Sequence, residues 1–94
     1  MVVFDYRGWN CHMIRRLGGF TIDMVSIAEV SKLCGMKASY TISEFKTMYS
    51  LISNRNIYPS HKIFDIYQLS LSWDVAKRNA MDYIDKNFGS APSL

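Results

Sequence analysis

The sequence is poor in the residues that would stabilise a small secreted domain or build a phosphate site. It has two cysteines, Cys11 and Cys34, too few for a disulfide framework in 94 residues. Its five glycines form no glycine-rich phosphate loop, and the pair Gly18-Gly19 is typical of a helix stop. No apolar run is long enough to span a bilayer, and Asp5 and Arg7 interrupt the apolar start. We therefore expect a cytoplasmic protein without membrane contact.

Catalytic signatures are missing as well. Cys11 and His12 are neighbours in the chain, so their side chains point in different directions on a helix or a strand. A Cys-His nucleophile pair would need Cys11 or Cys34 to meet His61 in space. A zinc site from the two cysteines and two histidines would lack the usual ligand spacing. The acidic residues are too dispersed to form a catalytic pair. We expect no enzyme activity, no metal and no cofactor, with buried thiols and surface imidazoles.

The composition favours one folded domain. Hydrophobic residues make up 49%, aromatic residues 14% and charged residues 20% of the chain, as in globular proteins. We assign residues 1–89 to a single globular domain and residues 90–94 to a flexible C-terminal tail. Such a high apolar content leaves aromatic side chains for a partner surface or a homodimer contact. The net charge of +3 permits nucleic-acid binding without requiring it, because the basic residues are scattered.

The first quarter of the chain contains short segments of mixed type. Residues 2–6, VVFDY, are β-branched and aromatic and predict a strand. Asn10 is placed to cap a brief helix, CHMIRRL, which would end at Gly18-Gly19. Residues 20–25, FTIDMV, alternate between apolar and polar. They predict either a second short strand or an extended lead-in to the next helix.

Two capped helices are predicted after this. Ser26 and Glu29 fit a capping box, in which the hydroxyl accepts a backbone N–H and the carboxylate reaches back. Gly35 supplies a left-handed stop for this helix, residues 26–34. The same capping pattern opens a second helix over residues 41–52, whose apolar residues keep helical spacing.

The last third has one ambiguous segment and one clear helix. Residues 53–62 hold a proline and two asparagines and predict a loop. Residues 63–71, IFDIYQLSL, fit a helix or a strand equally. Ser72 caps a helix over residues 72–88, which carries acid-first charge pairs four residues apart on its outer side. The predicted fold is mainly α with a few short strands (α+β), a small single domain containing a helix-turn-helix-like helix pair.

The stretch SIAEVSKLCGMKASYTISEFK, residues 26–46, resembles a half-motif of the AraC-type transcription regulators. The residues that match the family pattern are Val30, Ser31, Gly35, Met36, Ser39, Tyr40, Phe45 and Lys46. The resemblance implies a helix-turn-helix that contacts double-stranded DNA through Lys37, Ser39, Tyr40, Thr41 and Ser43. Under this hypothesis the phosphate anchors are Arg15, Arg16, Lys32, Lys37 and Arg55. A small DNA-binding transcriptional regulator is the leading interpretation.

The alternative is a non-enzymatic protein-interaction module. In that interpretation residues 26–46 are two capped helices that only pack together. The chain would act as an adaptor or inhibitor that binds a larger protein complex, as small proteins of phages and other mobile elements do. Its contact surface would be the helix over residues 72–88 and three aromatic residues expected to be exposed: Trp9, Tyr58 and Tyr67.

Overall fold

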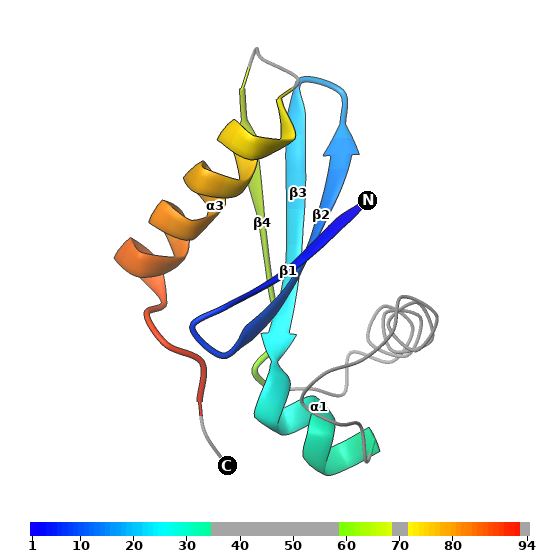
Figure 1. The fold of residues 1–94 in the computed structure, drawn as a ribbon, viewed down its shortest axis with the longest axis vertical. Helices are drawn as coiled ribbons and strands as arrows, with labels where there is room; N and C mark the ends of the chain where they lie inside the picture. Colours follow the sequence, from blue (N-terminus) through cyan, green and yellow to red (C-terminus); the bar gives the residue numbers. More distant parts are fainter. Residues whose placement is uncertain (35–58, 69–71, 93–94) are drawn as a thin grey trace.

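The fold is a four-stranded antiparallel sheet with one long helix on one face (Figure 1). The computed structural model describes residues 1–34, 59–68 and 72–92. The strands lie side by side in chain order: β1 (Val2–Tyr6), β2 (Trp9–Arg16), β3 (Gly19–Ser26) and β4 (Lys62–Tyr67). Helix α1 (Ile27–Cys34) follows β3, and helix α3 (Trp73–Asn87) follows β4 and packs back onto the sheet.

The prediction of a mainly α fold is wrong. Residues 9–16 include most of the predicted brief helix, but they form β2, which pairs with β1 on one side and with β3 on the other. Asn10 is a paired strand residue, and Gly18-Gly19 belongs to a hairpin connection where a helix stop was expected. The helix was predicted from a cap at Asn10 and only two turns of chain. Nucleating so short a helix costs free energy that its few hydrogen bonds do not recover. Pairing on both edges of β2 overrides these local signals.

Two tight turns fold the first three strands into a meander. Arg7 and Gly8 connect β1 to β2 with positive φ values of 50° and 80°. A type I′ turn needs positive φ at both central residues, and its twist matches that of the flanking strands. Gly18, with φ of 81°, makes the corresponding reversal between β2 and β3. These turns place the eight residues of β2 opposite the eight of β3.

Several local predictions are confirmed. The strand over residues 2–6 is β1, and the alternating residues 20–25 lie within β3. The helix over residues 72–88 is α3, where the Ser72 hydroxyl accepts the backbone N–H of Val75 at 3.4 Å. The described part of the ambiguous segment is a strand, because β4 extends to Tyr67, and residues 69–71 lie outside the described residues.

The N-terminus of α1 has an extended form of the predicted capping box. Ser26 Oγ accepts the backbone N–H of Glu29 at 3.3 Å, as predicted. The Glu29 carboxylate, however, bonds Ser60 where the capping box predicts Ser26. This carboxylate accepts the Ser60 hydroxyl at 2.7 Å, and Ser60 Oγ accepts the Ser26 N–H at 3.0 Å. A hydroxyl from the start of the β4 region therefore completes the cap. The predicted second helix, residues 41–52, lies outside the described residues.

Helix α3 packs closely because its inner side is small. Ala76, Ala80 and Ile84 are fully buried against the sheet. Short alanine side chains let the helix axis approach the strands, and the larger residues of the strands fill the space between. The sheet contributes alternate residues of its central strands, each at most 1% exposed: Cys11, Met13, Phe20, Ile22 and Met24.

The C-terminal half of α3 is tied to the β1–β2 turn. Asp85 accepts the Tyr6 hydroxyl at 2.7 Å and pairs with the Arg7 guanidinium at 2.5 Å. The indole N–H of Trp9 donates to the carbonyl of Gly89 at 2.9 Å, just past the helix end. These contacts fix the direction of α3 across the sheet.

The two glycines of the β2–β3 turn give a stability prediction. A Cβ on Gly19 would collide with the backbone carbonyl oxygen of Ile66, whereas nothing lies within 4 Å of a Cβ on Gly18. Gly19→Ala should therefore lower the free energy of unfolding by about 3 kcal/mol or more, through overpacking against backbone. Gly18→Ala, the matched control, should cost only about 1 kcal/mol, for its positive φ. Urea unfolding followed by circular dichroism measures both, and equal losses would contradict the close approach.

Candidate functional site

The sheet face opposite α3, here called the far face, is the candidate site. Side chains alternate between the two faces of a strand, so the residues between the core positions of β2, β3 and β4 project away from α3. One end, the polar half, lies toward α1 and consists of Asp5, Asn10, His12, Asp23 and His61. The other part, the exposed half, includes the end toward the β2–β3 turn and continues along the edge strand β4. Arg16, Leu17, Thr21, Asp65 and Tyr67 lie at the turn end, and Ile63 lies further along β4, opposite Asp23.

The polar half contains a directed chain of hydrogen bonds. The Asn10 amide nitrogen donates to Asp5 Oδ1 at 2.9 Å. The Asn10 oxygen is then left as an acceptor, and His12 Nε2 lies 2.9 Å from it. His12 therefore carries its proton on Nε2, since only that tautomer donates to an amide oxygen. Asn10 and His12 are each 1% exposed, so both polar groups are buried with their partners.

Burial keeps His12 neutral. Desolvation lowers the pKa of His12 from 6.5 to about 3, and the electrostatic effect of nearby His61 acts in the same direction. His61 in turn bonds through Nε2 to Asp23, which is 5% exposed and faces His12 across the β2–β3 pair. The polar half thus contains one neutral imidazole, that of His12, and a second, that of His61, which is bonded to the Asp23 carboxylate.

The polar half lacks a nucleophile. Cys11 faces α3, on the other side of the sheet from His12 and His61, so this thiol does not form the Cys-His pair that a nucleophilic enzyme would need. Burial, and secondarily the charge of Asp5, raises the pKa of Cys11 to about 12, which keeps the thiol protonated. In the described ranges no three His, Cys, Asp or Glu side chains are arranged to hold a metal. The imidazoles were expected at the surface, but His12 is buried and His61 is half-buried.

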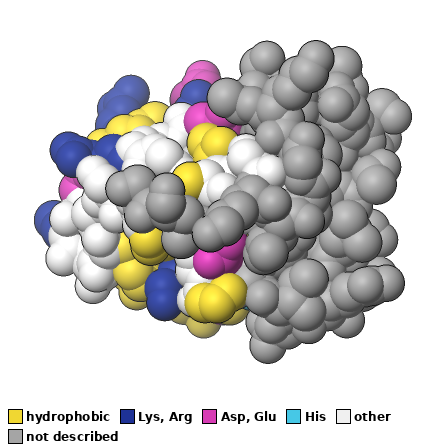
Figure 2. All heavy atoms as spheres, turned by 90° about the horizontal axis from the view of Figure 1, so that it is seen from below, with side chains coloured by type: hydrophobic (Ala, Val, Ile, Leu, Met, Phe, Trp, Pro, Cys, Tyr) yellow, Lys and Arg dark blue, Asp and Glu magenta, His cyan; other side chains and the backbone are white. Residues whose placement is uncertain are grey.

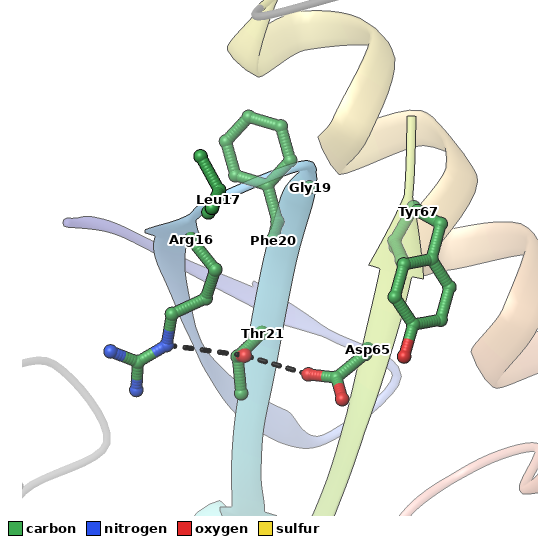
Figure 3. A pocket seen from close by; sticks show the side chains of 8 residues that line it. Arg16, Leu17, Gly19, Phe20, Thr21, Asp65 and Tyr67 are labelled. Carbon is green, nitrogen blue, oxygen red and sulfur yellow. Dashed lines mark hydrogen bonds between the residues drawn. The ribbon is translucent and has the colours of Figure 1, made fainter. Parts of the chain in front are cut away.

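The exposed half is built around an oriented arginine (Figure 3). Thr21 donates its hydroxyl to Asp65 Oδ1 at 2.6 Å. Having given its single proton to Asp65, Thr21 Oγ1 accepts from Arg16 Nε at 3.4 Å. Arg16 is exposed, and its guanidinium points along the face beside Thr21. This chain across three strands fixes the guanidinium through Nε.

A hollow of about 250 Å³ lies at this end of the sheet. Arg16, Gly19 and Tyr67 occupy one row across β2, β3 and β4. Gly19 has no side chain, so Arg16 and Tyr67 stand on either side of β3 with a gap between them (Figure 3). Leu17 lines the hollow from the turn. Thr21 and Asp65 line it as well, so the hollow combines both charges with a hydroxyl, an aromatic ring and an aliphatic side chain.

The predicted phosphate anchors do not converge. Arg15 and Arg16 are neighbours on a strand and therefore project from opposite faces. The Arg15 guanidinium lies over the ring of Trp73, 4.6 Å from its centroid, on the side of α3. Lys32 is in α1, at the other end of the sheet, and its side chain lies outside the described residues. The same holds for the other DNA-contact candidates: Lys37, Ser39, Tyr40, Thr41, Ser43 and Arg55.

The three aromatic residues expected at the surface have different outcomes. Trp9 is 2% exposed and packs edge-on against Phe88, so it is a core residue and not a contact residue. Tyr67 is 84% exposed, as expected. Tyr58 lies beyond the part of the chain that the structure describes.

The described surface has no dense field of positive charge in the view from below. There, Lys and Arg side chains are interspersed with Asp, Glu and apolar side chains (Figure 2). Nucleic-acid sites usually gather their basic residues into one stripe or patch. This view of the described residues gives no such patch.

Sequence reasoning missed the polar half and most of the exposed half. Asn10 and His12 alternate with apolar residues, which is a strand signal, but the expected helix cap at Asn10 obscured it. The row that joins Thr21 to Asp65 depends on the β3–β4 register. No local pattern discloses a register between segments so far apart.

The polar half predicts a pH dependence of stability. The pKa of His12 is lower in the folded protein, so the unfolded chain binds more protons between about pH 3 and pH 6.5. Lowering the pH through this window should reduce the free energy of unfolding, by up to about 1.4 kcal/mol per pH unit from this group. Urea unfolding at about pH 7, 6, 5 and 4 should show a shallower slope for His12→Gln than for the natural chain. Equal slopes would contradict a buried neutral His12.

Comparison with known proteins gives no match: no family model, no curated protein and no solved structure is similar to the chain. Within the described residues, no helix is both long enough and apolar enough to cross a membrane.

Proposed function

We propose that the chain is a non-enzymatic protein-binding module of the cytoplasm, and that the exposed half of the far face is its contact surface. The observation that supports this is a set of large apolar side chains in solvent on this face. Leu17 and Tyr67 line the hollow, and Ile63 lies further along β4, opposite Asp23. Leu17 is 105% exposed, Tyr67 84% and Ile63 62%. Single exposed apolar residues are ordinary, but a group of them beside a hollow is typical of an interaction site.

The scaffold under this surface is rigid. Ile63 and Tyr67 belong to β4, which pairs along its length with β3. On the other face, Phe64 stacks on Tyr83 of α3 with ring centroids 4.3 Å apart. Contact residues held on a packed sheet lose little conformational freedom on binding, which favours affinity. The protonated Cys11 thiol, turned toward α3, supports a function without covalent catalysis.

Crosslinking tests the contact surface directly. A photoreactive phenylalanine analogue in place of Tyr67 or Ile63 should give discrete crosslinked products in the cells that make this protein, because both positions face the partner. The matched control is the same analogue in place of Val75, which is 41% exposed on α3. Gel electrophoresis and mass spectrometry identify the products. Products at position 75 equal to those at 63 and 67, or none at the far face, would contradict the proposal.

DNA binding is a second candidate, supported by α1. This helix begins where the first helix of the predicted helix-turn-helix begins, with the predicted Ser26 cap. Arg15 and Arg16 do not assist it. They lie at the end of β2 opposite Gly19, and the eight residues of β3 put about 23 Å between that end and the start of α1.

The DNA candidate makes its own prediction. Affinity for a labelled random duplex should fall steeply between low and physiological salt, since phosphate contacts release counterions. Lys37→Glu should weaken this binding about tenfold or more. Lys86→Glu, an equal charge change at an exposed position of α3, should weaken it less. Fluorescence anisotropy measures all three proteins, and absence of duplex binding at low salt would remove this candidate.

A further inference from the structure

The outer edge of β4 offers backbone hydrogen-bonding groups to a further strand. In the described part of the chain β4 is the last strand of the sheet, and β3 is its one neighbour. The Gln68 N–H donates to the Gly18 carbonyl, and the Ile66 carbonyl lies against Gly19, so these groups point toward β3. Backbone groups alternate sides along an antiparallel strand. The N–H and C=O groups of the intervening residues therefore point outward: Ile63, Asp65 and Tyr67.

The same three residues carry the exposed side chains of β4 on the far face. Ile63 is 62% exposed and Tyr67 is 84% exposed, and Asp65 between them is exposed as well. A strand added at this edge would place every second side chain directly beside one of them. Backbone pairing and side-chain recognition therefore involve the same positions of β4.

Asp65 gives this row of side chains its charge. Its Oδ1 accepts the Thr21 hydroxyl from the β3 side at 2.6 Å (Figure 3). Within the described ranges Asp65 forms no ion pair, so its second oxygen can accept from a cation. Arg16 bonds Thr21 from the β2 side, away from the edge. A residue opposite Asp65 on an added strand would have its Cβ about 5 Å away, within reach of a Lys or Arg side chain.

A second copy of β4 does not supply that cation. Directly opposed residues of antiparallel strands lie on the same face of the sheet. Lys62 shares the face of the core residues Phe64 and Ile66, whereas Asp65 lies on the far face. In a pair of β4 strands Asp65 could therefore oppose an apolar residue or another Asp65, and two opposed carboxylates repel. Charge complementarity thus favours a strand from a different protein.

We infer that β4 binds an extended segment of the protein partner as an additional antiparallel strand, with a Lys or Arg opposite Asp65 and apolar side chains opposite Ile63 and Tyr67. This inference rests on the proposed protein-binding function. It adds the mode of binding, which is strand addition at a sheet edge. It also adds the pattern of the bound segment, in which apolar, basic and apolar residues occupy alternate positions.

An NMR titration of the full chain with a synthetic heptapeptide tests the inference. The probe alternates threonine with valine, lysine and valine, so that lysine is central, and both of its ends are blocked. At millimolar probe, the amide resonances of Ile63, Asp65 and Tyr67 should shift most. A probe with a central glutamate should bind about tenfold more weakly, because repulsion replaces attraction in the cross-strand pair.

N-methylation of the probe distinguishes strand addition from other binding. In an antiparallel pair with the outward-pointing residues of β4, the N–H groups of the lysine and the two valines donate to β4, and those of the threonines point away. A probe with N-methyl lysine should therefore not bind. The matched control is N-methylation of the threonine next to the lysine, which should weaken binding less than about twofold because that N–H makes no bond to β4.

Variants of the chain assign the charge preference to Asp65. Asp65→Asn keeps an acceptor for Thr21 but removes the charge, so the preference for lysine over glutamate should fall to about twofold or less. Asp65→Lys should reverse the preference. Asp82→Asn removes the same charge at an exposed position of α3 and should leave the preference unchanged. Thermal unfolding checks that each variant folds.

The outcomes separate this inference from the proposed function. The inference is overturned by absence of shifts at Ile63, Asp65 and Tyr67, by binding of the N-methyl lysine probe, or by a lysine preference that survives Asp65→Asn. Dimerisation of the chain through β4, measured by sedimentation velocity, would overturn it in favour of a second copy. Crosslinks at positions 63 and 67 without the peptide effects leave protein binding by the exposed half intact. The proposed function itself fails only with that crosslinking experiment.

Discussion

The pairing of β2 with β3 determines the rest of the structure. All eight residues of each strand are in register, from Trp9 opposite Ser26 to Arg16 opposite Gly19. Because side chains alternate, a slip of one residue would turn every side chain of a strand to the other face. Asn10 and His12 would then press against Ala76 and Ala80 of α3 without their hydrogen-bond partners. The apolar side chains that face α3 and the polar side chains buried on the far face thus allow only one register of β2 with β3.

The register also divides the sheet into faces with different properties. The face under α3 is an ordinary apolar core, whereas the far face buries polar groups at one end and exposes apolar groups at the other. Each buried polar group must find a partner or lose the energy of its hydrogen bonds to water. The chain from Asp5 through Asn10 to His12 meets this requirement for the Asn10 amide and for His12 Nε2, with residues of two adjacent strands. The polar half therefore contributes specificity of pairing, and the exposed half is left for recognition.

Local signals predicted β1, the start of α1 and the whole of α3, because each is defined by residues next to one another in the chain. The capping of α3 by Ser72 and its termination near Gly89 are examples. Strand β2 was not predictable in the same way. Asn10 resembled a helix cap, but its amide bonds Asp5 of β1, and β2 pairs with β1 on one side and with β3 on the other. The far face depends on contacts such as Thr21 with Asp65, which only the β3–β4 register brings together.

The bond network of Ser26, Ser60 and Glu29 has a topological consequence. Ser26 closes β3 and Ser60 precedes β4, and the two are hydrogen-bonded to each other. The chain therefore leaves the sheet and returns to it at one point, and the residues between are an insertion into an otherwise continuous meander. The entropy of closing such a segment rises only slowly with its length. A change in the number of residues between 35 and 58 should therefore cost little closure entropy, because Ser26, Glu29 and Ser60 hold the exit and the return of the chain together.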